Sequence, residues 1–159
     1  MTAGNIEPLE PSAWFDALER LLRRQRTSRD NDLFALLRHA YHLLQLTPCP
    51  LRSYVNAGAD EATFERYMAS AAGAQAALAL VGPGMAFSIS STARDEFQAR
   101  VWLTEHPGGA ATTSRSLASA LVGAWTKCLL DLRDRALRQD RDPGPHTGLC
   151  ERRPMPIQH

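Results

Sequence analysis

Two histidines and a cysteine form the most specific metal-binding pattern in the sequence. His39 and His42 are three residues apart in a segment with helical periodicity, and Cys49 follows. Two imidazoles at that spacing can face one metal ion, and Cys49, or the later pair His146 and Cys150, could complete a tetrahedral site. No two-cysteine ligand pair or His-Glu helix motif accompanies them. We therefore interpret the histidines as polar residues of a helix surface and predict no metal and no other cofactor.

The sequence lacks a recognisable arrangement for nucleophilic catalysis. No Gly-x-Ser-x-Gly elbow and no convincing acidic pair is present. Cys128 falls on an apolar helical stripe, which is typical of a small core residue. Cys49, between two prolines, could be an exposed thiol, with only Arg52 nearby to lower its pKa. We predict that the protein is not an enzyme and has no catalytic residues.

An arginine cluster near the N-terminus is the largest charge asymmetry. Five arginines within ten residues could neutralise phosphates of a nucleic acid: Arg20, Arg23, Arg24, Arg26 and Arg29. Acidic residues flank them, however, and arginine near a helix C-terminus is favoured by the helix dipole. A solvated helix face is the favoured interpretation, and nucleic-acid binding is the alternative.

A glycine-rich segment before a predicted helix is the candidate for anion binding. Pro107-Gly108-Gly109 precedes Thr112 or Thr113, either of which could cap the helix, and free backbone N–H groups at a helix start can bind an anion. A small anionic ligand would then lie near Thr112, Thr113, Ser114 and Arg115. Ordinary turn chemistry explains the glycines more simply, so a small-ligand-binding protein remains an alternative.

Length and composition indicate one domain without a strong charge bias. The chain has 159 residues, 44% hydrophobic and 22% charged, with a formal charge of +1, which gives no global field to attract nucleic acid or membrane. The stretch 68–94 is rich in Ala, Gly and Ser and is interrupted by Gly82-Pro83-Gly84, so no membrane span is expected. The absence of a secretory signal and the odd number of cysteines, three, favour a reducing, cytoplasmic location.

Periodicity predicts the elements that must position these residues. Apolar residues recur at helical spacing over 12–26 and again up to residue 46, which predicts an antiparallel α-hairpin. A short strand is possible over 51–55, a third helix follows from residue 60 to about 81, and alternation over 85–90 and 97–103 predicts a β-hairpin. Residues 104–111 are predicted to be a loop, followed by a helix that frays past Leu137.

These elements predict an α+β fold, with an N-terminal α-hairpin packed on an α-β-β-α unit of helix, antiparallel sheet and helix. The predicted organisation is a flexible segment 1–11, the α-hairpin 12–46, the α-β-β-α domain 51–138 and a disordered tail 139–159. A two-stranded hairpin is marginal in water, so its edge should pair with the 51–55 strand or with a second copy. We therefore predict a small oligomer, most simply a homodimer.

Trp102 is predicted to lie on the polar face of the hairpin. Either a helix covers that face or the indole belongs to an interface.

The segment Met68–Leu130 resembles a known family. The run from Ala74 to Gly84, the hairpin containing Phe97-Gln98-Ala99-Arg100-Val101-Trp102, and Ala111-Thr112-Thr113 opening an Ala/Leu-rich helix look like the phage ABA sandwich domain. The resemblance departs where Ser114 replaces a frequent proline and where the first strand lacks tryptophans. It implies helix-sheet-helix layers and an origin in a phage or prophage, and it supplies no reaction and no catalytic residues.

Together these observations predict a non-enzymatic interaction protein. We expect a phage or prophage accessory protein in the bacterial cytoplasm that occupies a surface of a host protein, or of a viral one. Aromatic residues in a chain of this size support a binding role, namely Trp14, Phe15, Tyr41 and Trp102.

Overall fold

The chain folds into helices on one side of a three-stranded antiparallel sheet. The computed structural model describes residues 6–92 and 94–139. The helical elements are α1 (Pro11–Thr27), α2 (Leu33–Gln45), α3 (Glu61–Ala69), α4 (Gly73–Leu78) and α5 (Leu117–Gln139), with short 3-10 helices at Asp30–Asp32 and Cys49–Leu51. The strands are β1 (Met85–Ser91), β2 (Phe97–Leu103) and β3 (His106–Ser114), in the order β1-β2-β3. The predicted α+β class is confirmed.

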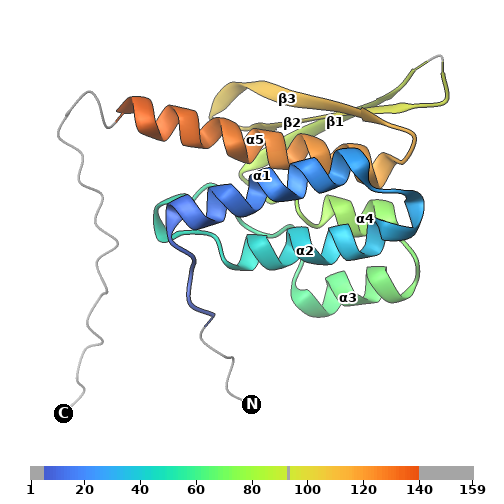
Figure 1. Cartoon of the computed structure of the whole chain (residues 1–159), viewed down its shortest axis with the longest axis horizontal. Helices are drawn as coiled ribbons and strands as arrows, with labels where there is room; N and C mark the ends of the chain where they lie inside the picture. Colours follow the sequence, from blue (N-terminus) through green and yellow to red (C-terminus); the bar gives the residue numbers. More distant parts are fainter. Residues whose placement is uncertain (1–5, 93, 140–159) are drawn as a thin grey trace, which may run out of the picture.

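Helix α5 occupies the centre of the molecule. It packs on the sheet through β2 and β3 and contacts α1 and α4 on its other side (Figure 1). Its buried positions therefore surround much of the helix rather than forming one stripe, and they include Leu121, Val122, Trp125 and Leu129. Helices α1 and α2 run antiparallel in the layer beyond α5, with α3 at the outer side (Figure 1).

Strand β3 corrects the prediction of a loop over 104–111. The segment His106–Ser114 pairs with β2, from Leu103 opposite His106 to Phe97 opposite Ser114, with a bulge between Val101 and Leu103. Thr112 and Thr113 therefore lie in a strand and do not cap a helix. Helix α5 begins at Leu117, and the Ser116 hydroxyl oxygen accepts a hydrogen bond of 3.3 Å from the Ser119 N–H.

Two further predictions about the middle of the chain are wrong. Residues 51–55 form no strand, because the Tyr54 and Val55 amides donate to the Leu51 carbonyl and close local turns. The predicted third helix is divided into α3 and α4, and Ala71 at the break has a φ of 54°. A non-glycine residue in this left-handed region ends a helix.

The third strand changes the argument for a dimer. The β1-β2 hairpin finds its partner strand, β3, within the same chain, so it does not need a second copy to complete a sheet.

The layer order also differs from the one that the family resemblance implies. Within residues 6–92 and 94–139, every helix lies on the same side of the sheet (Figure 1). Residues 1–5 and 140–159, which contain most of the predicted tail, lie outside the description.

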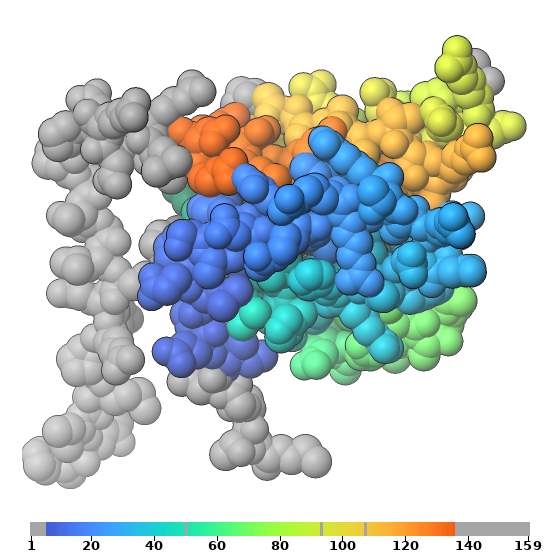
Figure 2. All heavy atoms as spheres, in the orientation of Figure 1, coloured from blue at the N-terminus to red at the C-terminus, as the bar shows by residue number. Residues whose placement is uncertain are grey.

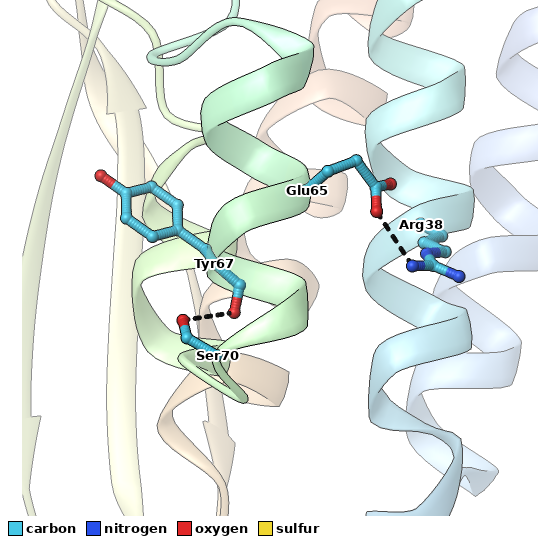
Figure 3. Close-up of polar contacts among 4 residues, drawn as sticks. All are labelled: Arg38, Glu65, Tyr67 and Ser70. Atoms are coloured by element: carbon cyan, nitrogen blue, oxygen red, sulfur yellow. Dashed lines mark hydrogen bonds and ion pairs between the residues drawn. The ribbon is translucent and has the colours of Figure 1, made fainter.

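Helix α3 is fastened to α2 by aromatic stacking and an ion pair. The rings of Tyr41 and Phe64 stack with centroids 4.1 Å apart, and the Tyr41 hydroxyl donates to the Ala59 carbonyl. Figure 3 shows Arg38 of α2 and Glu65 of α3 pointing toward one another, with 2.9 Å between Nη2 and Oε2. Both side chains are exposed, so the stacked pair contributes more to stability than the ion pair does.

A side chain of α1 donates a hydrogen bond to a carbonyl group in the last turn of α2. The last carbonyls of a helix lack intrahelical donors, and the indole N–H of Trp14 donates to the Leu43 carbonyl at 2.8 Å. Trp14 and Trp125 are both fully buried, but the Trp125 indole N–H has no hydrogen-bond partner.

The two tryptophans give a matched test of this contact. Trp14→Phe removes a buried hydrogen bond and leaves the Leu43 carbonyl unpaired, which costs about 1–3 kcal/mol beyond the lost packing. Trp125→Phe removes a donor that has no partner. In denaturant unfolding, Trp14→Phe should lower the free energy of unfolding by about 1–3 kcal/mol more than Trp125→Phe does. Equal losses would contradict this role of Trp14.

Candidate functional site

The predicted metal pattern is not completed by the described residues. His39, partly buried, and His42, exposed, lie on α2. Cys49 is disulfide-bonded, so the expectation of a reduced, exposed thiol there is wrong. Within residues 6–92 and 94–139, no group of three or more His, Cys, Asp or Glu side chains could hold a metal ion. The other proposed ligands, His146 and Cys150, lie outside these ranges.

Cys128 is a core residue, as its place on an apolar stripe predicts. It is buried in α5 as a free cysteine. Burial, followed by the nearby Asp131 carboxylate, raises the pKa of its thiol to about 11. At neutral pH the thiol is therefore protonated and lacks the reactive thiolate form.

The five arginines of the cluster are all exposed, and those with identified neighbours have different ones. Arg20 and Arg24 approach His39 across the α1-α2 hairpin, since both lower the pKa of that imidazole after the larger effect of burial. Arg23 instead lies near Glu19, whose carboxylate pairs with Arg133. Arg26 lines a polar groove between α1, β3 and α5, which is described below. Helix α1, which carries Arg20, Arg23, Arg24 and Arg26, forms the broad blue face in Figure 2 together with α2.

The outer face of the sheet is open to solvent. Residues paired across antiparallel strands share a face, which places Trp102 beside Ala86 and Arg100 beside Ser88 on the side away from α5. Trp102 is partly exposed and Arg100 is exposed. Among the described residues, no helix covers this face, so the alternative of a covering helix above Trp102 is wrong. A shallow hollow of about 290 Å³ on it is lined by Ser88, Ser90, Gln98, Arg100, Gly109 and Ala111.

Strand β1 leaves two large apolar side chains uncovered on the opposite face. Phe87 is 44% exposed and Ile89 39% exposed. Both point to the same side of the sheet as the buried Val101 and Ala99 with which they pair. Helix α5 covers β2 and β3 and does not extend over β1. The alternation over 85–90 predicted these side chains as core, and the exposure of this edge was not predicted.

A polar groove lies where α1, β3 and α5 meet. It has a volume of about 460 Å³ and is lined by Gln25, Arg26, Ser28, Ala111, Thr112, Thr113, Ser114, Ser119 and Lys127. Arg26 from the arginine cluster and Thr112 and Thr113 from the predicted anion site are thus brought together. Arg115 was predicted with them and is exposed, but it is not among the lining residues.

Sequence reasoning missed Gln25, Ser119 and Lys127. Gln25 is only 6% exposed, and its amide nitrogen donates to the Ser119 carbonyl at 3.2 Å and to the Ser119 hydroxyl at 3.1 Å. The sequence contains a signal that Gln25 is buried, because this residue continues the apolar spacing of Trp14, Leu18 and Leu21 on α1. A polar residue on a core stripe requires a buried partner.

Comparisons with protein-family models, curated proteins and solved structures found no match to this chain. Among the described helices, none is both long and apolar enough to cross a membrane.

Proposed function

We propose that the protein is a non-enzymatic interaction protein that binds a protein partner along strand β1. The observation that carries this proposal is the unprotected edge of that strand. Its seven residues pair with β2 in a regular register, and no other strand of residues 6–92 and 94–139 pairs with its other side. A free strand edge presents unpaired backbone N–H and C=O groups to an incoming strand.

The two edges of the sheet differ in how they resist pairing. Natural edge strands are blocked by charged side chains, prolines or bulges. Strand β3 contains Pro107 and lies against a bulge. Strand β1, Met-Ala-Phe-Ser-Ile-Ser-Ser, contains no charge and no proline and has no bulge. Of the two edges, β1 is therefore the one suited to strand addition, in which backbone bonds give affinity and alternate side chains give specificity.

Side chains on both faces of β1 extend the same surface. Phe87 and Ile89 would bury apolar area against a partner on one face, at roughly 25 cal/mol per Å² removed from water. On the other face, the small side chains of Ala86 and Ser88 leave Trp102 and Arg100 accessible. Tryptophan and arginine are the residue types most enriched in binding hot spots.

The biological setting of this proposal comes from the sequence. The resemblance of residues 68–130 to the phage ABA sandwich domain supports a phage or prophage accessory protein, with a host protein as its partner. A second copy of the chain is the alternative occupant of the β1 edge and would form the predicted homodimer.

A lysine placed on the β1 edge tests the proposal. Phe87→Lys should reduce capture of a stoichiometric protein from bacterial lysate to less than about a tenth of the wild-type amount, because a charge on an edge strand opposes pairing. Thr113→Lys is the matched control, since Thr113 is exposed on the opposite edge strand. It should leave capture unchanged. Thermal unfolding of both variants confirms that they fold.

Equal capture by the two variants would contradict strand addition at β1. Light scattering identifies the occupant. If the wild type is a dimer at micromolar concentration and Phe87→Lys is a monomer, the partner is a second copy and the host-protein part of the proposal fails.

Nucleic-acid binding is the second candidate, favoured by the exposure of all five arginines of the cluster, Arg20, Arg23, Arg24, Arg26 and Arg29. Non-specific binding through phosphates weakens with salt, with a log-log slope of about −0.9 per neutralised phosphate. If the arginine cluster binds duplex DNA, Arg23→Glu with Arg24→Glu should flatten this slope by about two and weaken all sequences alike.

A gel-shift titration over a range of salt concentrations measures that slope. A shift that survives high salt, or one that the two substitutions leave unchanged, excludes phosphate binding by the cluster. The strand-addition proposal expects no shift at physiological salt.

A further inference from the structure

The polar groove between α1, β3 and α5 has the composition of a ligand site. Its lining residues carry two positive charges, from Arg26 and Lys127, and no negative charge. Within the described part of the chain, neither cation forms an ion pair. The Lys127 ammonium donates one hydrogen bond, of 3.0 Å, to the Ala111 carbonyl, which leaves two of its three donors for a ligand.

Buried polar atoms without partners lie among the same residues. The Gln25 amide nitrogen is fully used by Ser119, but its oxygen, Oε1, is buried and has no hydrogen-bond partner. The Thr112 hydroxyl oxygen is buried and unpartnered as well. Each such group costs about 1–3 kcal/mol when left unsatisfied. Both atoms are closed to solvent, so a ligand donor gains that free energy once the two side chains turn toward the groove.

Gln25 and Thr112 both pack against Gly123 of α5. A Cβ atom added to Gly123 would lie 3.1 Å from Gln25 Oε1 and 2.7 Å from the Thr112 methyl carbon. Gln25 and Thr112 therefore come together from α1 and β3 over the same glycine. Ser28, Thr113, Ser114 and Ser119 also line the groove.

This combination selects a class of ligand. A carboxamide oxygen can only accept hydrogen bonds, so Gln25 calls for a hydroxyl or N–H donor, whereas Arg26 and Lys127 call for an oxyanion. A volume of about 460 Å³ suits a small metabolite. We propose that the groove binds a small phosphate ester that carries free hydroxyl groups, with its phosphoryl group on Arg26 and Lys127 and a hydroxyl on Gln25 and Thr112.

This proposal is independent of strand addition at β1. The groove uses β3, the opposite edge strand, together with α1 and α5. Loss of one activity therefore leaves the other intact, and the substitutions that test them share no residue.

Calorimetric titration at fixed ionic strength, with glycerol 3-phosphate, inorganic phosphate and glycerol as probes, tests the groove. Glycerol 3-phosphate should bind at least about tenfold more tightly than inorganic phosphate, because only the ester supplies both oxyanion and hydroxyl, and glycerol alone should not bind. Arg26→Gln should weaken the binding of glycerol 3-phosphate about tenfold. Arg24→Gln is the matched control, as an exposed arginine of α1 that does not line the groove, and should bind like the wild type.

Thr112→Val tests the hydroxyl contact without removing a charge. The substitution keeps the shape of the side chain. It should reduce the difference in affinity between glycerol 3-phosphate and inorganic phosphate, and it should leave the affinity for inorganic phosphate unchanged. Thermal unfolding shows whether each variant is folded. The proposal is overturned if no probe binds the folded wild type, if Arg26→Gln and Arg24→Gln bind equally, or if the ester binds no more tightly than phosphate.

Discussion

The close approach of α1 and β3 at Gly123 of α5 is the constraint on which the rest of the structure depends. Helix α5 is buried between the sheet and the other helices, so it needs short side chains wherever both layers press on it. At Gly123, Gln25 from α1 and Thr112 from β3 reach the same point, where a Cβ atom would lie 2.7 Å from the Thr112 methyl carbon. Because threonine is stiff about χ1, that carbon cannot easily move away.

The position of α5 determines which surfaces remain open. Since the helix lies over β2 and β3, it leaves the edge strand β1 and the outer face of the sheet without a covering element in the described structure. Phe87 on one face and Trp102 on the other are therefore exposed by the same arrangement. The same arrangement forms the polar groove beside Gly123, so both proposed binding surfaces follow from where α5 packs.

The sequence predicts what local periodicity encodes, and it does not predict what long-range contacts determine. Apolar spacing located α1, α2, α5 and the β1-β2 hairpin. Strand β3 was missed because its Pro-Gly-Gly-Ala-Ala run has neither alternation nor β-branched residues until Thr112, and pairing with β2 specifies it instead. The groove shows the same limit, because Arg26 and Thr112 were singled out for separate reasons and only the fold brings them together.

A comparison of two glycine substitutions tests the packing at Gly123 most directly. Helix propensity alone predicts that Gly→Ala inside a helix stabilises a protein by about 0.5–1 kcal/mol. At Gly73 of α4 an added Cβ meets only ordinary contacts, the nearest at 3.5 Å, so Gly73→Ala should be neutral or slightly stabilising. Gly123→Ala should instead lower the free energy of unfolding by about 1–3 kcal/mol, because overpacking outweighs propensity. A Gly123→Ala protein as stable as the wild type, or more stable, would contradict the account.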